Sequence, residues 1–204
     1  PEALPAILTG KDPDVFSDNG YQLKGNTVAS KLSKVGYRTG GFHSNVNVSR
    51  VYGYGNGFDT FDDDLFIGKN RILARLQRLI KKHLYRRPLY YSRADTINER
   101  CLQWVNKIGD EPMFLWAHYM DVHGPYDPVK EYREYYQSDP PDSSNARELF
   151  QRAMENPNSI TDKEKRLLID LYDTEIRYVD SQINELLSEL DDRDRLDDTL
   201  IIIT

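Results

Sequence analysis

The chain has 204 residues, of which 39% are hydrophobic and 29% charged, a composition typical of a folded protein rather than a disordered one. Its 33 acidic and 27 basic residues give a formal net charge of −6, which argues against nucleic acid as a partner because such a partner favours a basic surface. The single cysteine, Cys101, excludes an internal disulfide and a cysteine-rich zinc site, and no apolar run is long enough to predict a membrane segment.

The first half of the chain predicts a helix and a strand followed by a turn. Thr27 is a typical N-cap residue, and Gly36 stands where a helix over 28–35 would end. Residues 37–43 predict a strand. Three glycines within residues 52–59 predict a sharp turn, and the apolar spacing over 67–84 predicts a further helix.

The second half predicts two helices and two strands. Residues 92–108 predict a helix, with Ser92 and Asp95 as a capping box, and the apolar run 113–118 predicts a strand. The longest predicted helix runs from Thr161 to about Leu190, and its apolar residues repeat at intervals of three and four. We expect three of them to face a sheet: Leu171, Ile176 and Val179. The last apolar run, residues 200–203, predicts a final strand.

Helices therefore alternate with short, almost wholly apolar strands. Strands of this kind are buried on both faces, which indicates an α/β fold with a largely parallel central sheet flanked by helices. A buried strand at the end of the chain needs neighbours on both sides. We therefore expect residues 1–204 to form one incomplete domain.

Polar loops follow two of the predicted strands, and ligands of open parallel sheets bind beyond the carboxyl ends of the strands. One loop is His43 to Asn47, and the other runs from His118 to Tyr126. In the second loop, Asp121 and His123 could point into a shared cleft. A histidine there could donate a hydrogen bond to an anionic ester or protonate a leaving oxygen.

The opposing interpretation is that these histidines are structural. A histidine at the end of a strand is more often a hydrogen-bonded residue of the fold than a catalyst, and this holds for His118 and His123 alike. No spacing of histidines or carboxylates predicts a metal-ligand cluster, so we assign no metal ligand within the chain. The pattern alone leaves both interpretations of the loop open.

Six segments carry a further signal because they resemble, in the same order, segments of one protein family. They are LPAILTGKDP (4–13), VASKLSKVGYRTGGF (28–42), YGNGFDTF (54–61), EPMFLWAHYMDVHGPYDP (111–128), YDTEIRYVDSQINELLSEL (172–190) and LDDTLIIIT (196–204). Together they resemble a central portion of a sulfatase, in the alkaline phosphatase superfamily. The segment 111–128 is the most specific, being similar to the family's Phe-Phe-Leu strand and Pro-His-x-Pro-Tyr turn, with Val122 in place of the proline.

The resemblance implies an alkaline phosphatase-like fold and roles for particular residues. His123 would be the active-site histidine that contacts the sulfate or the leaving-group oxygen. The family's Gly-Lys-x-His segment is interpreted as replaced, with Ser44, Asn45 and Asn47 near it, and we expect these three residues to bind substrate. Asp121, beside His123, is assigned to substrate binding as well.

The resemblance also implies a divalent metal, calcium foremost, with magnesium, manganese or zinc as alternatives. The family's ligands lie in its first strand and in an Asp-His-Gly motif, both of which we expect outside residues 1–204. The nucleophile would stand immediately before Pro1, and Glu2 and Leu4 occupy the places of the signature's proline and arginine. Residues 1–204 would then be a single partial catalytic domain that lacks the nucleophile and the metal motifs.

The predicted function is hydrolysis of sulfate esters or phosphoesters of small molecules or glycans, by metal-assisted in-line displacement. Two alternatives remain. One is a phosphotransferase that moves a phosphoalcohol group onto a glycan or lipid. The other is a catalytically inactive relative that serves as a binding protein.

Overall fold

A computed structural model describes the chain except for residues 1–2, 13, 17–21, 65–90 and 136–142. The helix predicted at 67–84 lies outside the described residues. The chain divides into two compact units. The first comprises residues 1–86, 90–92 and 96–118, and the second comprises residues 87–89, 93–95 and 119–204.

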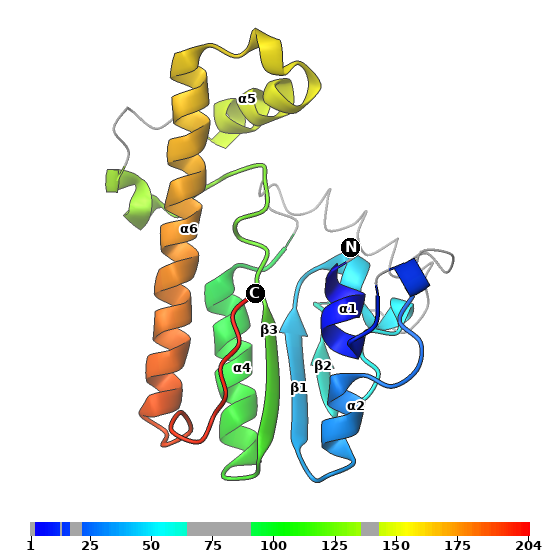
Figure 1. Ribbon diagram of the computed structural model, residues 1–204. Helices are drawn as coiled ribbons and strands as arrows, with labels where there is room; N and C mark the ends of the chain where they lie inside the picture. The colour runs from blue at the N-terminus through cyan, green and yellow to red at the C-terminus, as the bar shows by residue number, and fades with distance from the viewer. Residues whose placement is uncertain (1–2, 13, 17–21, 65–90, 136–142) are drawn as a thin grey trace. The chain divides into compact units, whose positions relative to one another are not determined.

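Among its described residues, the first unit is built on a parallel sheet of three strands in the order β2-β1-β3 (Figure 1). The strands are β1 (Arg38–His43), β2 (Thr60–Asp62) and β3 (Met113–His118). The register pairs Phe42 with Asp62 and His43 with His118, so the carboxyl ends of all three strands lie at one edge. The predicted α/β class with a parallel sheet is confirmed.

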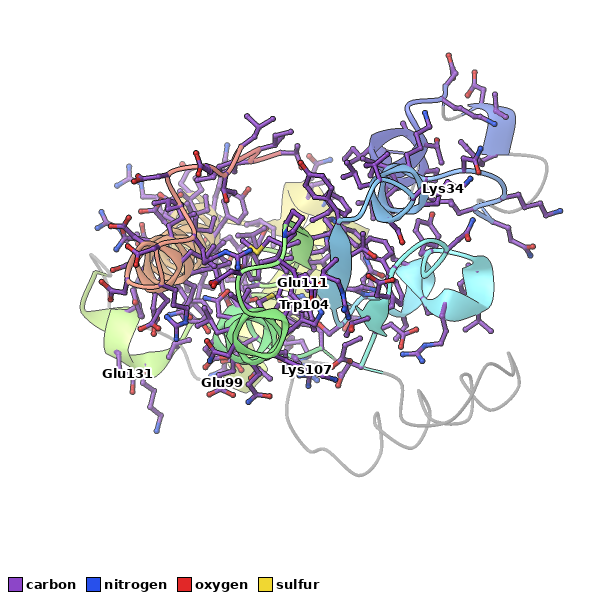
Figure 2. All side chains as sticks on the ribbon, turned by 90° about the horizontal axis from the view of Figure 1, so that it is seen from below. Lys34, Glu99, Trp104, Lys107, Glu111 and Glu131 are labelled. Atoms are coloured by element: carbon purple, nitrogen blue, oxygen red, sulfur yellow. The ribbon has the colours of Figure 1, made fainter. Side chains whose placement is uncertain are left out.

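Helices pack on both faces of the sheet, because each face carries apolar side chains. Trp104 of α4 (Ala94–Ile108) packs against Phe42 with ring centroids 5.9 Å apart, while Glu99 and Lys107 lie exposed on the outer side of α4 (Figure 2). On the other face, Trp116 packs on a core cluster that includes residues of α1 (Ala3–Thr9) and α2 (Val28–Ser33). The buried members of this cluster are Leu8, Leu23, Val48 and Tyr54.

Local signals fix α2 and the turn that follows β1. Thr27 caps α2 in a reciprocal box with Ser30, and Gly36 beyond its end has a φ of +95°, a conformation that favours glycine. The predicted sharp turn contains Gly57, whose φ is +86°. A Cβ there would stand 2.3 Å from the backbone nitrogen of Ser30, so only glycine allows this turn to pack against α2.

The start of α4 differs from the prediction. The helix begins at Ala94, two residues after Ser92, and the Ser92 hydroxyl donates to Asp64 over 3.3 Å. The first N–H groups of α4 are satisfied from elsewhere in the chain instead. The Asp95 N–H donates to the Tyr178 hydroxyl over 3.2 Å. A local sequence motif cannot predict a cap that tertiary contacts supply.

Within its described residues, the regular secondary structure of the second unit consists of helices. These are η4 (Lys130–Tyr135), α5 (Ser143–Glu155), η5 (Pro157–Ser159) and the 30-residue α6 (Asp162–Asp191), which Thr161 and Glu164 cap in a reciprocal box. Tyr126 joins two of them, since its ring lies 5.2 Å from that of Phe150 in α5 and 5.4 Å from that of Tyr172 in α6. Within the described residues, no helix is both long and apolar enough to span a membrane.

Of two predictions about this unit, one is wrong in part and the other is wrong. Leu171 of α6 is buried as expected and Val179 is half-buried, but Ile176 is 42% exposed, because the buried positions next to Leu171 are the polar Thr174 and Glu175. The strand predicted at 200–203 does not form. These residues pair with none of the described strands, and their side chains are exposed, because an extended segment becomes a strand only when a partner supplies the ladder of hydrogen bonds.

Candidate active site

Two histidines stand side by side at the carboxyl edge of the sheet, in the first unit. His43 ends β1 and His118 ends β3, and their ring centroids lie 6.2 Å apart. His43 is fully buried, with its ring between Phe61 at 5.1 Å and Trp116 at 5.4 Å. The alternation of side chains along β1 directs His43 to this face, where the aromatic rings exclude water.

The hydrogen bonds of His43 define its tautomer. The backbone N–H of Asn45 donates to Nδ1 over 3.1 Å, so the neutral ring carries its hydrogen on Nε2. Burial, and next the charge of His118, lower the pKa of His43 to about 3 against the opposing pull of Asp63. Nε2 is buried and has no hydrogen-bond partner among the described residues. His43 is therefore a neutral donor in a dry environment.

Asn45 links the two histidines. Its side-chain amide donates to Nε2 of His118 over 3.4 Å, while its backbone N–H reaches His43. Burial lowers the pKa of His118 as well, so both rings are neutral at neutral pH. Neutral imidazoles present one donor each without adding positive charge.

The other two residues predicted in this loop have different surroundings. The Ser44 hydroxyl donates to the backbone carbonyl of Ser92 over 3.1 Å and ties the loop to the start of α4. Asn47 is exposed, and its backbone N–H donates to Asn45 over 3.0 Å. Of the three predicted polar residues, Asn45 is the one that the structure brings together with both histidines.

His43 was missed as a site residue, although the sequence held a usable signal. The run Gly40-Gly41-Phe42-His43 retains the glycine and the histidine of a Gly-Lys-x-His segment at the same spacing. It lacks only the lysine. Asn45 and Asn47, which the sequence predicts as substrate-binding residues, lie two and four residues after His43.

A buried ion pair lies beyond the end of β2. Asp63 is fully buried, and Arg50 meets both of its oxygens, with Nη2 2.8 Å from Oδ1 and the backbone N–H 2.9 Å from Oδ2. Arg50 also donates to the carbonyl of Phe61 over 2.8 Å. This pattern fully satisfies the carboxylate. Asp63 therefore serves the fold of this edge.

Asp121, in the second unit, belongs to a second buried cluster. Arg93 lies 3.5 Å from Asp121 Oδ1 and 3.3 Å from Glu175 Oε2, and both carboxylates are fully buried. Burial raises the pKa of Asp121 to about 7, although Arg93 and the N–H of Ala94 oppose the rise, and burial also raises the pKa of Glu175. Two buried carboxylates share one guanidinium, so the desolvation of both outweighs the attraction of Arg93.

His123 stands in the turn between Asp121 and Asp127, also in the second unit, and it is exposed. Its Nδ1 lies 2.7 Å from the carbonyl oxygen of Gly124. Because a carbonyl only accepts, Nδ1 carries a hydrogen. The turn itself is closed by the His123 N–H, which donates to the carbonyl of Met120 over 2.8 Å.

The sequence of the chain matches one protein family over almost its whole length. A model of the Sulfatase family matches residues 2–204, and the chain therefore belongs to this family. No curated protein matches the chain. Family membership supports a hydrolase-like enzyme of the alkaline phosphatase superfamily, and members of the family act on sulfate esters.

Members of the family generally use a divalent metal, but the described residues do not fit one. No group of three or more histidine, cysteine, aspartate or glutamate side chains among them is arranged to hold a metal ion. The buried carboxylates that could contribute are bound to arginines: Asp63 to Arg50, and Asp121 and Glu175 to Arg93. The assignment of the ligands to segments outside residues 1–204 remains a prediction.

Proposed function

We propose that the protein is a sulfatase-like hydrolase that cleaves a sulfate ester or phosphoester of a small molecule or glycan by in-line displacement. The observation that carries the proposal is the family match over residues 2–204. The reaction class follows from the family, and the roles below are argued from the side chains of this chain.

In this proposal His43 and His118, both in the first unit, bind an anionic group. A buried donor without a partner is costly, and the Nε2–H of His43 has no acceptor among the described residues. An oxygen of a bound anion would satisfy it. Asn45 orients the pair by holding Nδ1 of His43 and Nε2 of His118. Ser44 holds this loop in place by donating to the Ser92 carbonyl.

His123 assists the leaving group. Its Nδ1–H is bound to the Gly124 carbonyl, which fixes the ring, and we assign to Nε2 the transfer of the proton to the departing oxygen. Asp121 anchors the start of this turn on Arg93. We therefore propose that Asp121 supports the turn instead of binding substrate, and we assign Asn47 no role in the reaction.

Turnover of aryl sulfates and aryl phosphates by the full-length protein, in the presence of divalent cations, tests the proposal. We expect hydrolysis of at least one ester class, and we expect His123→Ala to lower turnover by about 10²-fold or more, the scale of general-acid loss. Thermal unfolding would verify that the variant is folded. Transfer to an added alcohol in preference to water would support the phosphotransferase instead. Absence of turnover with every ester would indicate the inactive relative.

A further inference from the structure

The turn that carries His123 is held at its far end by its backbone. The Asp127 N–H donates to Glu175 Oε1 over 3.0 Å, and the Asp127 carbonyl accepts from Nη2 of Arg93. Glu175 and Arg93 are themselves bound to each other, with Oε2 and Nη1 3.3 Å apart. Arg93, Glu175 and the backbone of Asp127 therefore form a closed ring of hydrogen bonds.

The near end of the same turn is held by the same guanidinium. Asp121 Oδ1 lies 3.5 Å from Nη1 of Arg93, and the Asp121 carboxylate also accepts from the N–H of Ala94 at the start of α4. Arg93 is in addition held over the ring of Tyr178, 5.5 Å from its centroid. Both ends of the segment 121–127 are therefore attached to Arg93, and His123 lies between them.

Stability alone does not explain this cluster. Removing two carboxylates from water costs more than one arginine returns, and apolar residues of similar volume are often as stabilising as a buried ion pair. Asp121 Oδ2 has no partner among the described residues, which adds to the cost. What the charged groups provide, and apolar groups cannot, is directional bonds to the backbone of the turn.

We propose that Glu175 and Arg93 are positioning residues for His123, holding the backbone of Asp127 so that the imidazole meets the leaving-group oxygen. The inference rests on the proposed function. Neither residue touches the substrate in this scheme. A displacement of about 1 Å in a catalytic group lowers rates by roughly 10²-fold, so a loosened turn would reduce catalysis without removing a reacting atom.

The test uses esters whose leaving groups differ in basicity, because only a poor leaving group depends strongly on a proton donor. In the full-length protein we expect Glu175→Ala to lower kcat for an alkyl or phenyl ester by about 10–100-fold, the range between partial and full loss of the donor. For a 4-nitrophenyl ester we expect a loss of about threefold or less, because nitrophenolate leaves without a proton. KM should change little for either ester.

Three further variants separate positioning from general damage. In a His123→Ala background, Glu175→Ala should cause less than about twofold further loss, because residues that act as a unit are not additive. Glu175→Gln keeps an oxygen that accepts from the Asp127 N–H, so it should restore most of the rate. Glu185→Ala changes an exposed glutamate on the same helix that accepts from Gln182, and it should behave like the wild type.

Hydrogen exchange supplies a readout that does not need activity. Amides of residues 121–130 should exchange faster in Glu175→Ala than in the wild type or in Glu185→Ala, because the Asp127 N–H has lost its acceptor. Unchanged exchange would overturn the positioning role even in an active enzyme. Equal losses for both leaving groups, or full additivity with His123→Ala, would also overturn it. A wild-type protein without any turnover would instead overturn the proposed function, whatever the exchange shows.

If Glu175→Ala does not fold, Arg93→Lys replaces it in the same comparisons. Lysine keeps the charge but cannot reach Asp121, Glu175 and the Asp127 carbonyl with one planar fork. We expect the same dependence on the leaving group. A rate loss that is equal for both esters would again contradict positioning.

Discussion

Burial, rather than a charged neighbour, decides the protonation of His43. The ring is enclosed by Phe61 and Trp116, and the desolvation of a charged imidazole there exceeds the attraction of Asp63. Asp63 itself is bound to Arg50, so its field at the ring is partly offset. The result suits a group that contacts an anion by hydrogen bonding, because its state does not vary between pH 5 and 8.

The stability of the protein should carry a signature of His43. In the unfolded chain its pKa is 6.5, and in the folded chain it is about 3. Between these values the unfolded state binds a proton that the folded state does not, so the contribution to stability is present above pH 6.5 and is lost as the pH falls toward 3. The slope from one group is at most about 1.4 kcal/mol per pH unit.

Urea unfolding at pH 7 and pH 5 measures this. We expect the free energy of unfolding to decline less with falling pH in His43→Gln than in the wild type. The comparison is between the two slopes, so any loss that the substitution causes at both pH values cancels. Parallel profiles would mean that the ring is hydrated or already charged in the folded protein.

At the scale of elements, the local signals predicted α6 well but not its buried side. Thr161, Glu164 and the repeat of apolar residues predict where the helix begins and how long it is. The buried side includes Thr174 and Glu175, which no hydropathy pattern selects. Thr174 is tolerated because its hydroxyl donates to the Asp170 carbonyl over 2.7 Å, and Glu175 because Arg93 and Asp127 bind it.

Paired substitutions on α6 test the corrected side. Leu171 is 2% exposed, and truncation of a buried leucine leaves a cavity, so Leu171→Ala should lower the free energy of unfolding by about 2–5 kcal/mol. Ile176 is 42% exposed, and Ile176→Ala should change it by only about 0.5 kcal/mol. Chemical denaturation measures both. Equal losses at the two positions would show that both side chains are buried, as the apolar repeat predicted.

The same contrast explains what else could be predicted at this scale. The strands β1 and β3 follow from their apolar runs, and α2 from Thr27 and Gly36, because these signals are local. The cap of α4 could not be predicted, since Tyr178 lies 83 residues from the N–H that it accepts. The segment 200–203 has the composition of a strand, yet pairing depends on a partner strand that composition does not reveal.

For the molecule as a whole, the fold class and the family were predicted, and the chemistry of the site was predicted in part. Six segments in a fixed order were sufficient for the family, which the match over residues 2–204 confirms. Asn45 was found among the polar residues after β1. The histidine pair was not, because the pairing of His43 with His118 is a property of the register between two strands 75 residues apart. That the chain is a single partial domain stays a prediction.

Whether residues 1–204 bind a metal depends on whether they contain its ligands. We expect a divalent metal site of this family to draw its carboxylates from separate strand ends, and a closed site needs all of its ligands. At the sheet edge described above, the buried Asp63 is bound through both oxygens to Arg50, and Asp64 accepts from Arg100 over 3.2 Å. Replacing these arginine contacts with a metal ion would take from Arg50 its carboxylate partner and from Arg100 one of its two.

We therefore expect the polypeptide of residues 1–204 to bind no divalent ion tightly. Calorimetric titration with calcium, magnesium, manganese and zinc measures this, and the control is the full-length protein, which should bind with defined stoichiometry if the family's ligands lie in its flanking segments. Circular dichroism of the 204-residue polypeptide would establish that it is folded before titration. Tight, stoichiometric binding by residues 1–204 would show that the ligands lie within them, in residues that the arginines release or in parts of the chain beyond the described ranges.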